Sequence, residues 1–345
     1  MNKVVFNVEK NIIDSSNNID DDLVYKRNTL SLPSIKSGIA NHCMVPWNHV
    51  AVDHKGRIFI CRCEGWLPFS VGHVTDFTSF DEIFSSEIAI KIQKSIINKE
   101  YEYCAVDYCG IKNGNHKSED IHLNINIDIS CNLSCPSCRE HMIFVKDDRI
   151  ISEKQRWIDI IVQWIEKSPK TVIVGCQGGE PFASLLYSTV IEDLVKLPNT
   201  KFQITTNGTL LKSRSDLVEK IINKTDFFRI SIDGASKDIY ETVRRGAKWD
   251  SLLENLDYLK SLGKNHCGMF VIQKQNISDV LSFVEFCKIY NLTPEYTVLQ
   301  DWGTWHNFKD HCVHYRDSEL YEQFKEIVKL LEDKKVSIYS LKEWL

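Results

Sequence analysis

Three cysteines, Cys131, Cys135 and Cys138, lie in the stretch CNLSCPSC, with a Cys-x3-Cys-x2-Cys spacing directly after a strand-like run. Structural zinc sites usually have four Cys or His ligands. Three thiolates on a four-iron cluster instead leave one iron without a protein ligand, and a cofactor or substrate can bind there. His141 is an alternative fourth ligand, which would close a zinc site.

A second group of cysteines lies nearer the N-terminus, at Cys43, Cys61, Cys104 and Cys109. Four thiolates can complete the coordination of a second [4Fe-4S] cluster or of a zinc ion, and composition does not choose between them. Cys63 is an ambiguous thiol, because it can replace a neighbouring ligand or simply pack.

The overall composition is that of an ordinary globular protein, with 345 residues, 43% hydrophobic and 26% charged residues. The net charge of -5 and the lack of a Lys/Arg-rich block argue against a nucleic-acid partner. Apolar segments are short, and no signal peptide or membrane span is evident. We therefore expect a cytoplasmic protein without a membrane partner.

The elements that must position these thiols alternate between strand and helix from about residue 120. Short segments rich in Ile, Val, Phe or Thr predict six strands, at 121–130, 170–177, 201–206, 227–233, 268–273 and 295–300. Amphipathic patterns predict helices at 152–167, with Ser152 in a capping box, and at 249–265, 278–290 and 318–333.

This alternation predicts an α/β fold with parallel strands, and six strands suit a partial (β/α)6 TIM-like barrel. Ligand chemistry in such folds gathers at the carboxyl ends of the strands. We divide the chain into an N-terminal arm (1–40), a small cysteine-rich iron-sulfur module (41–115) and the partial barrel with its C-terminal helix (120–345).

Three further motifs follow successive strands: GGEP, TTNG and SIDG, the last continuing into an arginine pair. Together with the cysteine loop they resemble the radical S-adenosylmethionine (SAM) superfamily over most of residues 120–300. The resemblance implies a [4Fe-4S] cluster on the three cysteines and SAM bound at its open iron. It also implies a set of SAM-binding residues: Gly178, Gly179, Glu180, Pro181, Thr206, Asn207, Ser231 and Arg244. Ser137 departs from the family pattern, which often has an aromatic residue there.

The N-terminal module resembles the twitch half-module of the SPASM group of radical SAM enzymes. The shared features are the cysteines, the PW dipeptide, the turn at Asp53–Gly56, VGHV and FDEIFSSE. The resemblance implies an auxiliary [4Fe-4S] cluster on Cys43, Cys61, Cys104 and Cys109. In most relatives this module follows the barrel, whereas here it precedes it.

The last predicted strand leads into QDWGTWH, so Asp301, Trp302, Trp305 and His306 are candidate substrate contacts at the barrel mouth. Tryptophans with polar neighbours suit stacking on a sugar or an aromatic group, although they can equally cover a core. The histidine-rich segment that follows, HNFKDHCVH, has no recognised metal spacing and is interpreted as a polar loop.

The resemblance implies an enzyme that reductively cleaves SAM to a 5′-deoxyadenosyl radical, which takes a hydrogen atom from its substrate. A flavodoxin- or ferredoxin-type protein would supply the electron. Because only 42 residues precede Cys43, we expect a small sugar- or nucleoside-like substrate rather than a peptide. The alternatives are a peptide-modifying maturase and a zinc-stabilised, non-catalytic binding protein.

Overall fold

The computed structural model describes residues 13–14, 43–62, 69–104, 119–342 and 344–345 of the chain. The expected N-terminal arm therefore lies outside the described residues, except for the short strand β1 (Ile13–Asp14). β1 pairs in parallel with β6 (Ile143–Phe144), which follows the three-cysteine loop along the chain.

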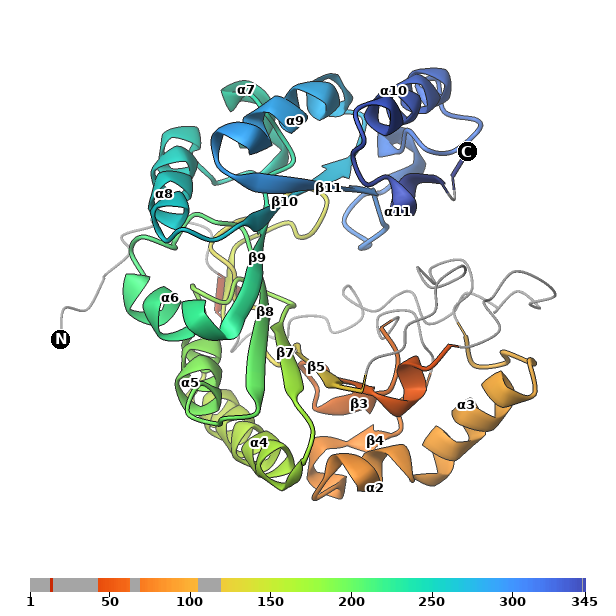
Figure 1. Cartoon of the computed structure of the whole chain (residues 1–345), viewed down its shortest axis with the longest axis vertical. Coiled ribbons are helices and arrows are strands. Elements are labelled where there is room, and N and C mark those ends of the chain that lie inside the picture. Colours follow the sequence, from red (N-terminus) through yellow and green to blue (C-terminus); the bar gives the residue numbers. More distant parts are fainter. Residues whose placement is uncertain (1–12, 15–42, 63–68, 105–118, 343) are drawn as a thin grey trace.

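One nine-stranded sheet runs through the described part of the chain in the order β11-β10-β9-β8-β7-β5-β2-β3-β4. Its strands are β2 (His49–Val52), β3 (Arg57–Phe59), β4 (Gly72–His73), β5 (Ile121–Ile125), β7 (Val172–Cys176), β8 (Thr200–Thr206), β9 (Thr225–Ser231), β10 (His266–Ile272) and β11 (Leu292–Val298). The six predicted barrel strands are β5 and β7 to β11, all paired in parallel. Because β11 and β4 are separate edges, the sheet is not closed and the partial barrel is confirmed (Figure 1).

The N-terminal hairpin is continuous with the barrel sheet. β2 pairs in parallel with β5, and β3 and β4 extend the sheet in antiparallel fashion. The β2–β3 turn is fixed by Asp53, whose Oδ1 accepts the backbone N–H groups of Lys55 and Arg57 at 3.0 and 2.8 Å. Gly56 supplies the positive φ of 74° that this turn needs. The N-terminal hairpin and the barrel thus share one set of strand hydrogen bonds.

Helices cover the outer side of the curved sheet, where α4, α5, α6, α8 and α9 lie in Figure 1. The helices are α2 (Phe80–Phe84), α3 (Glu87–Ile97), α4 (Asp148–Lys167), α5 (Leu185–Leu194), α6 (Ser215–Ile221), α7 (Lys237–Val243), α8 (Trp249–Ser261), α9 (Val280–Ile289), α10 (Tyr321–Asp333) and α11 (Tyr339–Lys342). Short 3-10 turns occur at η2 (Val45–Trp47), η4 (Val74–Asp76), η6 (Ile222–Lys224), η7 (Ile277–Asp279) and η8 (Phe308–His311).

The predicted start of α4 was wrong by a full turn. The helix begins at Asp148, because the side chain of Asp147 accepts the backbone N–H of Arg149 at 2.8 Å and caps it. Ser152 therefore lies inside the helix rather than at its cap. The predicted end is confirmed, with Ser168 as the C-cap.

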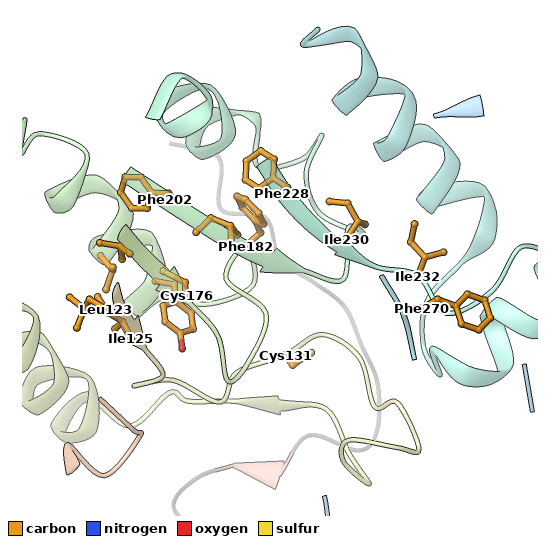
Figure 2. Close-up of a cluster of buried hydrophobic side chains, with 14 of the residues drawn as sticks. Leu123, Ile125, Cys131, Cys176, Phe182, Phe202, Phe228, Ile230, Ile232 and Phe270 are labelled. Carbon is orange, nitrogen blue, oxygen red and sulfur yellow. The ribbon is translucent and has the colours of Figure 1, made fainter. Parts of the chain in front are cut away.

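The hydrophobic core lies between the sheet and the outer helices. Figure 2 shows Phe182, Phe202 and Phe228 packed in this layer, and the ring centroids of Phe182 and Phe228 are 6.3 Å apart. Phe202 of β8 and Phe228 of β9 are fully buried. The residues next to each of them on the same strand are half-buried or exposed. One face of the sheet is therefore core, and the other is available to a ligand.

Within the described residues, no helix combines the length and the apolar composition needed to cross a membrane.

Candidate functional site

The three-cysteine loop follows β5 at the carboxyl end of the strand. Cys131 and Cys135 are buried, at 9% and 6% exposed, and Cys138 is exposed. Cys131 exchanges two backbone hydrogen bonds with Ile143, its N–H donating at 2.7 Å and its carbonyl accepting at 3.3 Å. The Cys138 N–H donates to the Cys135 carbonyl at 2.9 Å. The loop is therefore a fixed turn that is pinned at both ends.

The loop after β8 contacts this turn through side-chain amides. Asn207 Nδ2 donates to Asn132 Oδ1 at 2.9 Å, and Asn132 Nδ2 donates to Thr209 Oγ1 at 2.9 Å. Asn207 Oδ1 in turn accepts from Thr209 Oγ1 at 2.7 Å. The TTNG motif thus lies against the cysteine loop, as the order of motifs along the chain suggested.

Two further segments contact the cysteine loop from the far side of the barrel. Arg245 Nε donates to Ser134 Oγ at 3.2 Å, and the Ser134 N–H donates to the Arg245 carbonyl at 3.0 Å. Thr304 Oγ1 donates to the Pro136 carbonyl at 2.8 Å. Segments that follow β5, β8, β9 and β11 therefore meet at one end of the sheet.

Guanidinium groups donate to two of the three thiols. Arg139 Nη2 lies 3.6 Å from Cys138 Sγ, and Arg244 Nη1 lies 3.8 Å from Cys135 Sγ. Burial raises the pKa of Cys131 to about 12 and also raises the pKa of Cys135, so neither buried thiol ionises readily by itself. Positive charge beside the sulfurs favours their thiolate forms, which are the forms that bind metal.

The donor set of this loop fits an iron-sulfur cluster, because three thiols share one loop and guanidinium groups lie beside two of them. Among the described residues, no group of three His, Cys, Asp or Glu side chains is arranged to hold one metal ion. On a four-iron cluster each thiolate binds a different iron, so the thiols need not converge on one point. His141, the alternative fourth ligand, is 46% exposed, and its Nε2 lies 3.9 Å from Glu140 Oε2.

The GGEP segment lies directly against the cysteine loop. The Glu180 N–H donates to the Ser130 carbonyl at 2.7 Å, and a Cβ on Gly179 would come within 2.2 Å of that same oxygen. Gly178 has a φ of 104°, which glycine adopts without strain. Pro181 is buried, as is Glu180. The two glycines therefore permit the close approach of two backbone segments.

The Glu180 carboxylate points into the protein rather than toward a ligand site. It accepts from Thr206 Oγ1 at 2.7 Å, from the Asn207 N–H at 2.6 Å and from the Phe182 N–H at 3.2 Å. Burial raises the pKa of Glu180, against the lowering effect of these donors. Glu180 thus joins the loop after β7 to the loop after β8, and this segment can offer a ligand its backbone.

Ser231 precedes Asp233 in the chain and Arg244 follows it, and Asp233 comes shortly after the carboxyl end of β9. Ser231 is the last residue of β9 and is half-buried. Arg244 Nη2 lies 2.7 Å from Asp233 Oδ2, and the Nε of Arg244 is buried with no hydrogen-bond partner among the described residues. Burial acts to lower the pKa of Arg244, but Asp233 and Cys135 outweigh it and raise that pKa.

The N-terminal cysteine group is only partly described. Cys43 is buried, and Cys61 and Cys104 are half-buried, whereas Cys109 and the ambiguous Cys63 lie outside the described residues. Burial raises the pKa of Tyr101, and Cys104 and Cys43 add to that rise. Two of the four predicted ligands thus interact electrostatically with Tyr101.

The candidate substrate residues form an exposed segment after β11. Trp302 is 43% exposed and His306 is exposed, while Asp301 Oδ1 accepts the Gly303 N–H at 2.7 Å. Trp305 stacks on His311 with ring centroids 4.1 Å apart. The nearby contact from Thr304 to the cysteine loop places this segment beside the site.

The family comparisons agree with this geometry. Residues 125–287 match the radical SAM superfamily, and residues 43–110 match the SPASM iron-sulfur cluster-binding domain. The chain contains a radical SAM domain. The SPASM domain precedes it, as predicted from the sequence.

Curated relatives of the radical SAM domain are distant. GTP 3',8-cyclase from Listeria monocytogenes is 25% identical over 175 residues, which are 48% of this chain and 50% of that protein. Molybdenum cofactor biosynthesis protein 1 from Dictyostelium discoideum is 25% identical over 172 residues, 48% of this chain and 26% of that protein. This chain thus spans about half, or less, of the length of these relatives.

Solved structures are similar to this chain only at low identity and with TM-scores below 0.5. Streptococcus suis SuiB bound to S-adenosylmethionine is 18% identical with a TM-score of 0.47, over 74% of this chain and 58% of that chain. Native anSMEcpe with bound AdoMet is 18% identical with a TM-score of 0.46, over 61% of this chain and 59% of that chain. Likenesses of this degree say nothing about the substrate of this chain.

The sequence-based prediction missed two residues of the radical SAM domain that the fold brings to the cysteine loop. Arg139 follows the third cysteine directly, but its sequence position does not reveal where the guanidinium goes. Asp233, in the SIDG motif, was not among the predicted site residues, whereas its side chain holds Arg244. Its φ of 61°, which few non-glycine residues adopt, is the structural sign of its role.

Proposed function

We propose that this protein is a radical SAM enzyme that reductively cleaves S-adenosylmethionine and abstracts a hydrogen atom from a small, polar, sugar- or nucleoside-like substrate. The observation that carries the substrate class is the polar inner face of the barrel sheet, described below. The family assignment supports the reaction class.

In this proposal Cys131, Cys135 and Cys138 hold a [4Fe-4S] cluster with one open iron. When bound and reduced, that cluster supplies the electron that splits S-adenosylmethionine into methionine and a 5′-deoxyadenosyl radical. The thiols fit this role because they lie in one pinned loop with two guanidinium donors. The protein orients the cofactors and excludes water.

The proposed SAM site lies where the segments after β5, β7, β8 and β9 meet. Its residues are the eight named from the sequence: Gly178, Gly179, Glu180, Pro181, Thr206, Asn207, Ser231 and Arg244. Backbone from the GGEP segment would contact the methionine part, and Ser231 the ribose. The Arg244 guanidinium suits the SAM carboxylate, and its buried Nε is a donor without a partner among the described residues.

The SPASM domain is proposed to hold a second [4Fe-4S] cluster on Cys43, Cys61, Cys104 and Cys109. That cluster would accept an electron from the substrate or anchor it. A flavodoxin- or ferredoxin-type protein in the cytoplasm is the proposed reductant. Iron near eight per chain after anaerobic reconstitution is the expected stoichiometry, since each [4Fe-4S] cluster contributes four irons.

The inner face of the sheet is identified by the packing of β10. Phe270 contacts Phe283 of α9, with ring centroids 5.0 Å apart, so its neighbour Met269 faces the opposite side. Met269 pairs with Glu295 of β11 and with Ser231 of β9, which therefore share that inner face. The inner face is the side of the barrel that a substrate would occupy.

Polar side chains from several strands lie on this inner face, beside the apolar Met269. Arg229 Nε lies 3.0 Å from Glu295 Oε2, and these side chains are 32% and 33% exposed. Half-buried Asn124, Gln203 and Thr205 continue the polar face on β5 and β8. This face has a guanidinium neutralised by a carboxylate, with amides and a hydroxyl around it. Such a face suits a neutral substrate that forms hydrogen bonds better than it suits a substrate with an apolar side chain. The name of the GTP 3',8-cyclase relatives specifies a nucleotide, whose nucleoside part, but not its charged phosphates, belongs to this substrate class.

The test uses full-length protein reconstituted anaerobically with iron and sulfide, then supplied with S-adenosylmethionine and dithionite. Nucleosides, sugars and short peptides are added separately, and 5′-deoxyadenosine is measured against a reaction without substrate. We expect a nucleoside or sugar to increase its formation. Glu295→Gln should reduce that increase by roughly 10- to 100-fold and leave the substrate-free rate unchanged, since one lost charged hydrogen bond costs about 1.5–3 kcal/mol.

The matched control is Glu285→Gln, which removes a carboxylate from an exposed pair with Lys288, where the side chains are 60% and 66% exposed. It should leave both rates unchanged. An increase with peptides alone would assign the chain to the peptide-modifying maturases. Zinc without iron, and no cleavage of S-adenosylmethionine, would identify a zinc-stabilised binding protein.

A further inference from the structure

Arg139 connects three parts of the candidate site. Its Nη1 donates to the Ile129 carbonyl at 2.6 Å, and its Nη2 donates to the Gly178 carbonyl at 3.2 Å and lies 3.6 Å from Cys138 Sγ. One guanidinium thus links the end of β5, the glycine segment and the third cysteine. Only arginine has a rigid fork of donors that reaches such separate acceptors at once.

Cys138 needs such a contact more than the other two cysteines. Cys131 and Cys135 are buried, whereas Cys138 is exposed at the end of the turn. The guanidinium of Arg139 contacts its sulfur and is itself anchored by two backbone carbonyls. The direction of the Cys138 thiol is therefore set by Arg139 rather than by core packing.

The charge of Arg139 differs from that of Arg244, the other guanidinium beside a cluster thiol. Arg244 is neutralised by Asp233 at 2.7 Å. Arg139 has no carboxylate within ion-pair distance among the described residues, since its partners there are two carbonyls and a thiol. It therefore places an uncompensated positive charge beside the Cys138 sulfur. This charge also interacts electrostatically with Cys131 and Cys135.

We propose that Arg139 is a positioning residue for Cys138 and that its charge makes the radical SAM cluster easier to reduce. Reduction adds one electron to the cluster, and a fixed positive charge nearby stabilises the more negative state. Hydrogen bonds to cluster sulfurs act in the same direction, because they favour added negative charge. The electron comes from the external reductant, and no bond in Arg139 changes.

The test is an EPR-monitored redox titration of reconstituted full-length Arg139→Gln, Arg139→Lys and wild-type protein. The radical SAM cluster is recognised as the signal that changes when S-adenosylmethionine is added. For Arg139→Gln we expect the equilibrium constant for reduction to fall roughly tenfold, a midpoint about 59 mV more negative for a one-electron couple. Arg139→Lys should lie much nearer the wild type, because it keeps the charge.

The matched control is Arg149→Gln, which removes the same charge from a side chain that is 90% exposed. Its midpoint should equal that of the wild type. An unchanged midpoint in Arg139→Gln, or an equal shift in Arg149→Gln, would overturn the proposal.

Iron content tests the positioning role separately. Arg139→Gln could lose its cluster while its thermal unfolding midpoint stays unchanged. In that case Arg139→Lys must restore both the iron content and a redox midpoint potential near that of the wild type. Failure of the lysine variant to restore iron would contradict the role of the charge. Because these measurements follow a potential and a stoichiometry, they do not depend on which substrate the enzyme uses.

Discussion

Asp233 Oδ2 lies 2.7 Å from Arg244 Nη2, in a pair whose side chains are 4% and 14% exposed. Asp233 Oδ1 also accepts the Val271 N–H at 2.7 Å, so the carboxylate is anchored to β10. The pair therefore fixes the guanidinium at the carboxyl end of β9, next to Cys135. An arginine predicted to contact a ligand is in this way held in place by a carboxylate that the protein supplies.

Replacing Asp233 with Asn should destabilise the protein, because it leaves a buried guanidinium without its counter-charge. We expect the free energy of unfolding to fall by about 3 kcal/mol, as is usual when one partner of a buried pair is removed. Chemical denaturation of apoprotein measures it. The control is Asp250→Asn, in an exposed pair with Lys237, where a change within about 0.5 kcal/mol is expected. Equal effects of the two variants would contradict the buried-pair interpretation.

Replacing Gly179 with Ala should disturb the cysteine loop directly. The new Cβ would lie 2.2 Å from the Ser130 carbonyl oxygen, so one of two packed backbone segments must move. Overpacking of this kind costs on the order of 1–3 kcal/mol, and we expect 5′-deoxyadenosine formation to fall. Gly263→Ala serves for comparison, because nothing lies within 4 Å of its added Cβ and only its φ of 77° is strained. Normal activity in Gly179→Ala would mean that the two segments can separate without loss.

Changing Cys131, Cys135 and Cys138 together to Ala should abolish 5′-deoxyadenosine formation and leave about four irons per chain, the content of one [4Fe-4S] cluster. The remaining absorbance would come from the SPASM domain. The double variant Cys176→Ala and Cys287→Ala is the matched control, because both thiols are fully buried and burial raises the pKa of each. It should keep its full iron content. Persistent cleavage of S-adenosylmethionine in the first variant would show that the two sites had been assigned wrongly.

His266 should make the protein less stable in mild acid. Its Nδ1 accepts the Phe228 N–H at 3.0 Å, and its Nε2 has no hydrogen-bond partner among the described residues. Burial, with a smaller effect of Lys264, lowers the pKa of His266 from 6.5 to about 4. Below about pH 6.5 this histidine therefore binds a proton in the unfolded chain but not in the folded protein. The free energy of unfolding consequently falls as the pH falls toward 4.

Between pH 7 and pH 5 this histidine should account for a loss of about 2 kcal/mol in the free energy of unfolding. His266→Asn keeps an acceptor for the Phe228 N–H and removes the titration. Denaturant unfolding at both pH values should then show a smaller loss for the variant than for the wild type. An identical loss would mean that His266 does not set this pH dependence.

Much of the barrel could be predicted from the sequence because the information is local. Each of the strands β5 and β7 to β11 is a short run rich in Ile, Val, Phe or Thr, and its bounds were predicted to within five residues at either end. The first residues of α4 were misplaced because Asp147 and Ser152 are both good caps, and only the surrounding chain decides which one is used. The SPASM domain was predicted from its cysteines and turn motifs.

The sequence by itself determined which residue types could do chemistry: three thiols in one loop, glycines beside them and arginines further along the chain. Only the tertiary structure decided how they are combined. β2 joins β5 in one sheet, Glu180 turns inward to the β8 loop, Asp233 neutralises Arg244, and Arg139 is left with its charge beside Cys138. The physical reason is that long side chains can reach several partners, and the choice depends on segments that are distant in the chain and are brought together only when the sheet forms.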